Sequence, residues 1–131
     1  MTQVSAKNPF DLFVEHSVAP SEQAQFVEQS AVVCDASNGN RVLYVSSAFE
    51  SHTGYRPDEA IGRNLSFLQG PETEPDAIAL FRHLLKTGAP GKVRITNYRK
   101  DNTCFLHECD LRPVRAPSGE ITHYIAIQRP V

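Results

Sequence analysis

Five stretches of the chain are rich in β-branched and aromatic residues and are separated by short turn segments that contain Gly, Asn or Pro. Along the last three stretches, polar and apolar side chains alternate, as in strands with one buried and one exposed face. The first two stretches flank an Asn-Gly-Asn turn, which tolerates positive φ angles. The pattern predicts five strands, at residues 31–35, 41–46, 93–99, 104–114 and 121–128.

Helical spacing of apolar residues is clearest in residues 75–86, where they recur at intervals of three, three and one, and Gly88 follows as a stop signal. Shorter helices are predicted at residues 47–52 and 57–61, each followed by a glycine. Residues 8–29 are predicted to be helical or irregular. The chain therefore begins with a helical segment that precedes the first strand.

The order of the elements is two strands, several helices and then three strands joined by hairpins. This order predicts an α+β fold, in which one five-stranded antiparallel sheet is covered on one face by helices. We expect residues 1–30 to form an N-terminal helical extension and residues 31–131 to form the domain itself.

Alternation along the strands places polar side chains on the face that should be buried. Asn97 and His107 each share a face with apolar residues of their own strand, and most charges of residues 104–114 lie on the face opposite His107. Both faces of residues 121–128 are apolar, so the inward face of this strand stays open; if Gln128 points inward, it shares that face with Ala126 and Tyr124. An unpaired buried amide costs ~1–3 kcal/mol, so these groups need partners. They either pair with each other and with loop backbone, or they surround a polar heterocycle in an apolar pocket.

Composition and charge exclude several classes. The chain has 131 residues, a net charge of −2 and scattered lysines and arginines, so it has no nucleic-acid footprint. No apolar run reaches the ~18 residues of a membrane span, and the N-terminus does not read as a signal peptide. Three cysteines without metal spacing indicate reduced thiols in a cytoplasmic protein, without a zinc site. We expect the remaining histidines to be surface residues: His16, His52, His83 and His123.

Residues 62–73 read GRNLSFLQGPET. This string resembles the flavin-binding motif of LOV (light-oxygen-voltage) domains in the PAS superfamily, usually written GRNCRFLQGPET. Further matches follow in order at Asn97-Tyr98 and at residues 125–128, which read IAIQ. The resemblance runs from about residue 31 to residue 131 and implies a PAS/LOV-like fold.

The resemblance also implies roles for individual residues. Asn64 and Gln69 would contact the ribityl chain and the ring edge of a flavin. Arg82 would hold the phosphate as a charge-assisted partner. Asn97 would contact the pyrimidine edge of the ring, and Gln128 would lie at the ring atoms that change with redox state.

The departures from the family are as informative as the matches. Leu65 stands where the family has its photoactive cysteine, so the covalent photoadduct is excluded at this position. Ser66 replaces a phosphate-binding arginine, His107 replaces the second pyrimidine-contacting asparagine, and Ala126 replaces a small glycine against the ring. Cys34 replaces a threonine of the first strand and is interpreted as a small apolar filler.

The resemblance therefore predicts a cysteine-less sensor domain that binds FMN, riboflavin or FAD non-covalently and signals in response to light or redox state. Photoreduction by a nearby donor would replace the adduct, and a rotation of Gln128 would report it. The candidate donors are Tyr44, Tyr55, Tyr98 and Tyr124. We expect no enzyme, because no catalytic constellation is apparent. The alternatives are a flavin-free PAS domain for dimerisation or protein association, and an engineered Leu65 that leaves a fluorescent flavoprotein.

A subunit contact is predicted on the outer face of the sheet. We expect four apolar side chains to be exposed there: Leu106, Val114, Ile125 and Ile127. The apolar N-terminal stripe of Phe10, Phe13 and Val14 is complementary to that face. We expect a homodimer through these surfaces; the alternative is that the helix folds back on its own sheet. Because the chain ends soon after the last strand, we expect output through the N-terminal segment, the sheet surface or a separate effector protein.

Overall fold

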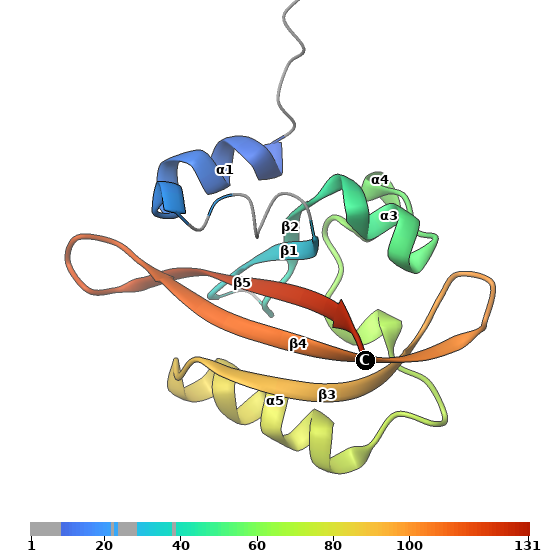
Figure 1. Ribbon diagram of the computed structural model, residues 1–131. Coiled ribbons are helices and arrows are strands. Elements are labelled where there is room, and N and C mark those ends of the chain that lie inside the picture. The colour runs from blue at the N-terminus through green and yellow to red at the C-terminus, as the bar shows by residue number, and fades with distance from the viewer. Residues whose placement is uncertain (1–8, 22, 24–28, 38) are drawn as a thin grey trace, which may run out of the picture.

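The computed structural model describes residues 9–21, 23, 29–37 and 39–131 of the chain. Its centre is one five-stranded antiparallel sheet in the order β2-β1-β5-β4-β3, so the first strand pairs with the last (Figure 1). All five predicted strands are confirmed, with ends within about two residues of the prediction. They are β1 (Ser30–Asp35), β2 (Val42–Val45), β3 (Gly91–Tyr98), β4 (Cys104–Arg115) and β5 (Ile121–Pro130).

The helices between β2 and β3 also agree with the prediction, with one addition. The additional element is a 3₁₀ turn, η1 (Leu65–Leu68), within the segment GRNLSFLQGPET of residues 62–73. Asn64 caps this turn, because its side-chain oxygen accepts a hydrogen bond from the Ser66 amide at 2.9 Å. The α-helices are α1 (Pro9–Ser17), α3 (Ser47–Thr53), α4 (Pro57–Ala60) and α5 (Pro75–Thr87). Part of the predicted segment 8–29 lies outside the described residues. None of the described helices is long and apolar enough to cross a membrane.

The inner face of the sheet packs against α5. Leu84 of α5 lies so close to β3 that a Cβ atom on Gly91 would be 2.8 Å from the end of the leucine side chain, which would then have to shift. Val93, Ile95, Cys109 and Leu111 complete this core with the buried side of α5. Gly88 ends the helix in the left-handed conformation, with φ 74°. The core therefore fixes α5 over β3 and β4.

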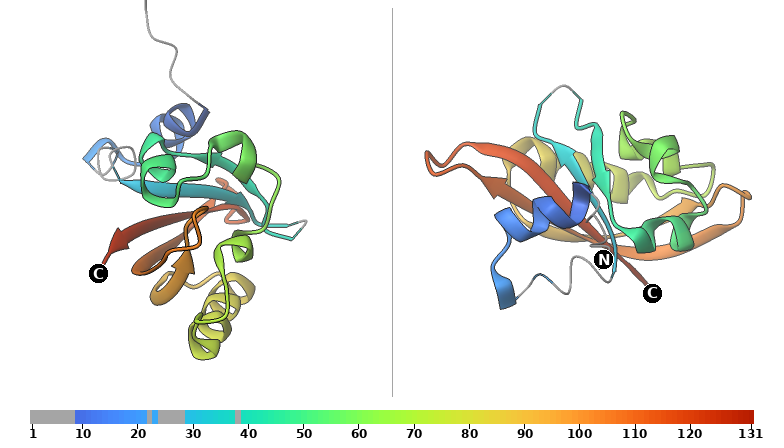
Figure 2. Two further views of the ribbon diagram at one scale, coloured as in Figure 1. Left: turned by 90° about the vertical axis from the view of Figure 1, so that its right-hand side faces the viewer. Right: turned by 90° about the horizontal axis from the view of Figure 1, so that it is seen from above.

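The outer face of the sheet is covered by α1, which lies on the opposite side of the sheet from α5 (Figures 1 and 2). Val14 is fully buried there in one cluster with Ile125 and Ile127. The prediction that Ile125 and Ile127 are exposed is therefore wrong, because a distant segment of the same chain covers them. Val114 is half-buried at the edge of this cluster, and Leu106 is 43% exposed as predicted.

Asp110 also departs from the predicted solvent-facing set of β4. It is buried with 5% exposure, and its carboxylate contacts the guanidinium groups of Arg112 at 3.2 Å and Arg129 at 3.8 Å. A buried carboxylate is tolerated when cations compensate its charge, which alternation along one strand does not reveal.

Candidate functional site

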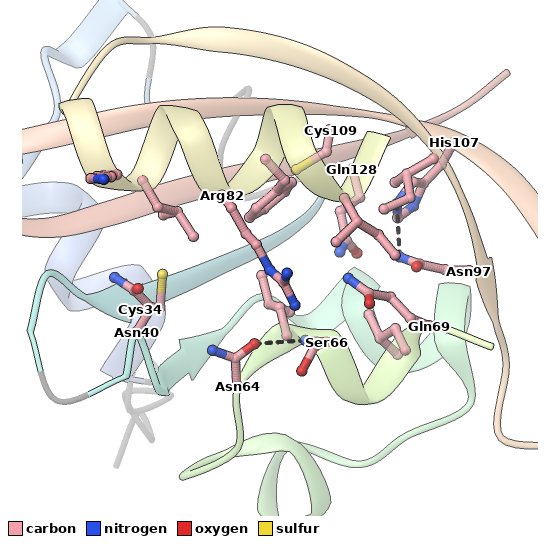
Figure 3. A pocket seen from close by; sticks show the side chains of 17 residues that line it. Cys34, Asn40, Asn64, Ser66, Gln69, Arg82, Asn97, His107, Cys109 and Gln128 are labelled. Atoms are coloured by element: carbon pink, nitrogen blue, oxygen red, sulfur yellow. Dashed lines mark hydrogen bonds between the residues drawn. The ribbon is translucent and has the colours of Figure 1, made fainter. Parts of the chain in front are cut away.

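A cavity of about 350 Å³ lies between α5, η1 and the inner faces of the strands. This volume is in the range of small-molecule sites. Its lining combines aliphatic and aromatic side chains with several amides, one imidazole and two cations (Figure 3). The lining residues are Cys34, Asn40, Asn64, Leu65, Ser66, Leu68, Gln69, Ile78, Phe81, Arg82, Leu85, Lys86, Ile95, Asn97, His107, Cys109 and Gln128.

At one end, which we call the closed end, the cavity is lined by Asn97, His107 and Gln128 from three adjacent strands. Their exposed fractions are 5%, 1% and 3%. The face assignment made from strand alternation is thus confirmed for Asn97 and His107, and Gln128, whose face alternation left open, also points inward. Register explains the convergence, because Cys109 of β4 pairs with Gln128, and Ile95 of β3 pairs with His107.

Asn97 and His107 bond to each other but keep unsatisfied atoms. Asn97 Nδ2 lies 3.0 Å from His107 Nε2 (Figure 3). An amide nitrogen only donates, so Nε2 accepts and a neutral ring carries its proton on Nδ1. That Nδ1 and the Asn97 Oδ1 are buried without a partner in the described structure. The closed end therefore holds one unused donor and one unused acceptor.

The His107 ring is held neutral by its surroundings. Burial lowers its pKa to about 4, and the nearby His52 acts in the same direction. The His52 ring is stacked on His107 at 6.0 Å between centroids and meets Phe105 edge-on at 4.7 Å. The prediction that His52 is a surface residue is wrong, since it is half-buried and its Nε2 is buried without a described partner.

Gln128 connects the cavity to a second surface. Its Oε1 accepts a bond from Ser30 Oγ at 2.9 Å. Gln128 and Ser30 also line a second, shallow groove, whose other lining residues include Ser51 and His52 of α3 and Arg129. A rotation of the Gln128 amide would break or reverse the Ser30 bond. Such a rotation would change the hydrogen bonding of Ser30, the first residue of β1.

The opposite end, which we call the mouth, is lined by Asn40, Asn64, Ser66, Arg82 and Lys86. Four of the five are exposed, and Asn40 is half-buried. In Figure 3, Arg82 reaches from α5 toward Ser66 and Asn64. Asn64 is held in place, because its Nδ2 donates to the Gly39 carbonyl at 2.6 Å. Lys86 was not singled out by the sequence, although it lies one helical turn after Arg82.

Leu65 and Gln69 also line the cavity, together with two thiols, those of Cys34 and Cys109. Burial raises the pKa of Cys34 to about 12, and it also raises the pKa of Cys109 well above that of a free thiol. Both thiols are therefore protonated near neutral pH and are poor nucleophiles. Cys34 packs in the inner core, as predicted for a small apolar filler.

The loop after η1 is fastened to β3. A Cβ atom on Gly70 would be within 2.3 Å of the Tyr98 ring, so only glycine lets the loop lie against it. The Glu72 amide donates to Tyr98 Oη at 2.9 Å, and Thr73 Oγ1 donates to the Thr96 carbonyl at 2.7 Å. The wall of the cavity next to Gln69 is fixed to the sheet in this way.

Seven of the eight candidate site residues line this cavity. The exception is Ala126, which is fully buried in the inner core. Among the described lining residues there is no tyrosine. Of the candidate electron donors, Tyr124 packs in the core between the inner face of the sheet and α5. Its phenol hydroxyl donates a hydrogen bond of 2.9 Å to the carbonyl of Leu85, which lines the cavity.

Comparisons with known proteins agree with this geometry. The chain is 37% identical to Phototropin-2 of Oryza sativa over 103 residues, 78% of this chain and 11% of that protein. It is 36% identical to a blue-light photoreceptor of Listeria monocytogenes over 92 residues, 70% of this chain and 36% of that protein. The third relative is the bacterioopsin transcriptional activator of Halobacterium salinarum, 34% identical over 125 residues, 92% of this chain and 18% of that protein. The chain thus spans well under half of each.

Two solved structures superpose closely. One is a light-oxygen-voltage domain described in connection with a flavin analogue, with a TM-score of 0.79, 35% identity, and coverage of 84% of this chain and 82% of that one. The other is the Aureochrome1 LOV domain in its light state, with a TM-score of 0.77, 34% identity, and coverage of 86% and 89%. The PAS domain model matches residues 29–130. This chain belongs to the PAS domain family, with LOV domains among its relatives.

Proposed function

We propose that this chain is a sensor domain that binds FMN non-covalently in the cavity between α5 and the sheet. The observation that carries the proposal is that one cavity has two kinds of unused groups at its two ends. The closed end has an unpaired hydrogen-bond donor and acceptor, and the mouth has two cations without a described partner. A flat heterocycle with an imide edge would satisfy His107 Nδ1 and Asn97 Oδ1. An anionic tail would then lie at Arg82.

The apolar middle of the cavity suits the ring of such a ligand. Leu65 and Phe81 line it from η1 and α5, and Ile95 lines it from β3. Burying a ring between such side chains is favourable at ~25 cal/mol per Å² of apolar area. Asn64 and Gln69, next to them, offer amide groups to the hydroxyls of a ribityl chain.

We propose further that signalling proceeds without a bond between protein and cofactor. A bound flavin supplies absorption of blue light and uptake of electrons. Leu65 has no thiol, and the thiols of Cys34 and Cys109 are kept protonated by burial. Tyr124 is the favoured electron donor, because it packs in the same core and bonds to a lining residue. We propose binding and signalling for this chain, without catalysis.

The proposed output begins at Gln128. Its amide lies between the cavity and the groove beside α3, and Ser30 Oγ is its bonded partner. A change in protonation at the adjacent ring atoms would favour the reversed amide, which presents Nε2 to Ser30. The start of β1, which follows the N-terminal segment, would receive that change and pass it to a separate effector protein.

The proposal is tested by incubating the purified chain with FMN, removing free ligand by gel filtration and recording an absorption spectrum. We expect a structured band in the blue that elutes with the protein. Illumination with a reductant should bleach this band without forming a blue-shifted adduct band. A chain that elutes without flavin would contradict the proposal and support a flavin-free PAS module for protein association.

The homodimer through the N-terminal helix and the outer sheet face stays a prediction. Its premise is weaker than the sequence suggested, because Val14 already covers Ile125 and Ile127 within one chain. A dimer of this kind requires α1 to leave its own sheet or to exchange with a partner. Light scattering separates a monomer of 14.5 kDa from a particle of twice that mass.

A further inference from the structure

Among the described lysines and arginines, Arg82 and Lys86 differ from the others in their contacts. Every other described lysine and arginine has a carboxylate, a carbonyl, a hydroxyl or an aromatic ring as its partner. Arg82 and Lys86 have no hydrogen bond or ion pair with another described residue. They are also the two cations that line the cavity.

The cavity offers these cations no compensating charge. Its described lining contains no aspartate or glutamate. Arg82 and Lys86 are four residues apart on α5, so their side chains are neighbours on one face of the helix, about 6 Å apart along its axis. Like charges at this spacing repel each other, and an anion between them would relieve the repulsion.

The position of Lys86 on α5 shows where that anion would lie. Ile78, Phe81 and Leu85 line the cavity from the same helix, and each cation directly follows one of these apolar residues, Arg82 after Phe81 and Lys86 after Leu85. The helix thus presents a basic row beside its apolar row along the cavity. A ligand that fits this stripe has a flat apolar body and an anionic tail at the mouth.

We infer that Lys86 is the second cation of a phosphate subsite at the mouth and compensates for the serine at position 66. The inference rests on the proposed binding of FMN and names the residue that selects FMN over riboflavin. Arg82 offers a bidentate guanidinium, and Lys86 adds a point charge one turn away. A phosphate monoester carries a charge of about −1.5 to −2 at neutral pH, which two cations balance.

A structural role for Lys86 makes a different prediction. It lies in the last turn of α5, where a cation stabilises the negative end of the helix dipole. Such a role would change the thermal stability of the ligand-free chain and would not distinguish one flavin from another. The FMN-to-riboflavin affinity ratio therefore separates the two roles.

The experiment titrates the full chain with FMN and with riboflavin and follows flavin fluorescence. Lys86→Gln should weaken FMN binding by roughly twofold to fivefold and leave riboflavin binding almost unchanged. Lys86→Arg should restore the FMN affinity. Lys92→Gln is the matched control, because Lys92 is exposed on β3 and contacts Glu108, away from the cavity. The FMN affinity of the wild type should also fall more steeply with salt than that of Lys86→Gln.

An unchanged FMN-to-riboflavin ratio in Lys86→Gln would overturn the role of Lys86 while leaving flavin binding intact. Equal weakening of both flavins, with a lower melting temperature of the ligand-free variant, would assign Lys86 to helix stability and would also overturn it. A wild-type chain that binds neither flavin would overturn the proposed function itself.

Discussion

At the closed end of the cavity Asn97, His107 and Gln128 are almost fully buried, whereas at the mouth Ser66, Arg82 and Lys86 are exposed. Buried hydrogen-bonding groups lose ~1–3 kcal/mol when they are left unpaired, so a ligand that satisfies them gains strongly. Exposed charges contribute ~1 kcal/mol or less and are screened by salt. For the proposed flavin, the comparison predicts that the closed end would set how tightly it binds and that the mouth would set which flavin is preferred.

The largest expected effect concerns Leu65, which lines the cavity. Leu65→Cys places a thiol in the lining of the cavity, where the family has its reactive cysteine. We expect a blue-shifted adduct band after illumination of the FMN-loaded variant, and no such band in the wild type. Cys34→Ala in the wild type is the control. An adduct band in the wild type that disappears in this control would show that Cys34 reaches the ring despite its raised pKa.

The second prediction concerns pH and the closed end. The folded-state pKa of His107 is lowered to about 4 from an ordinary 6.5, so folding favours the neutral ring. Its contribution to stability is therefore complete above pH 6.5 and is lost as the pH falls toward 4, by up to roughly 3 kcal/mol. The pKa of His52 is lowered as well, which adds a change of the same sign.

Denaturant unfolding of the ligand-free chain at pH 7 and pH 4.5 measures this loss. In His107→Asn, where the side chain cannot titrate, the loss should be clearly smaller than in the wild type. Equal losses in the two proteins would show that His107 is hydrated in solution, and the closed end would then not be as dry as its burial implies.

The third prediction separates the two ends directly. Asn97→Leu keeps the branched shape of the side chain but removes the acceptor Oδ1 and the Nδ2 donor to His107, so FMN and riboflavin should both bind roughly tenfold to a hundredfold more weakly. Equilibrium titration of both flavins measures the effect. Arg94→Leu, on the opposite face of β3, is the matched control for strand stability, because Arg94 is exposed and its ion pair with Glu108 is 3.6 Å long. If only the binding of FMN became weaker, Asn97 would lie at the phosphate, and the proposed division of roles between the closed end and the mouth would be wrong.

The smallest effect is expected at the mouth. Ser66→Arg adds a third cation beside Arg82 and Lys86, and we expect FMN to bind up to about fivefold more tightly, with riboflavin unchanged. Ser66→Gln is the uncharged control. The gain should be larger in a chain that also carries Lys86→Gln, because fewer cations then share the phosphate. Equal FMN affinity with and without the arginine would show that position 66 is not at the phosphate.

Much of this site follows from the sequence because strand alternation is a local property. The inward faces of β3 and β4 were predicted from neighbouring residues alone, and they bring Asn97 and His107 to one cavity. The face of Gln128 stayed open, because β5 is apolar on both sides. The long helix was predicted from its apolar spacing. The basic position at Lys86 was missed, because only the apolar residues of this helix were considered. Charge at the positions next to an apolar stripe was the signal that would have found it.

What the sequence did not reveal depends on contacts between distant segments. Ile125 and Ile127 have the pattern of an exposed apolar patch, and only the return of α1 buries them. His52 lies in a short helix with no periodicity to mark its buried side, and it is covered by Phe105 from β4. Asp110 is buried only because Arg112 and Arg129 approach it from two strands.

The contact between Gly70 and Tyr98 has a kinetic consequence. Because the loop after η1 is fastened to β3, the cavity wall beside Gln69 cannot swing away while the sheet is intact. For FMN bound as proposed, the exposed mouth at Arg82 and Lys86 is the expected route, and the ring would lead on the way in and the phosphate on the way out. The residence time of the proposed flavin would then depend on the opening of the mouth and not on movement of the wall that Gly70 holds against Tyr98.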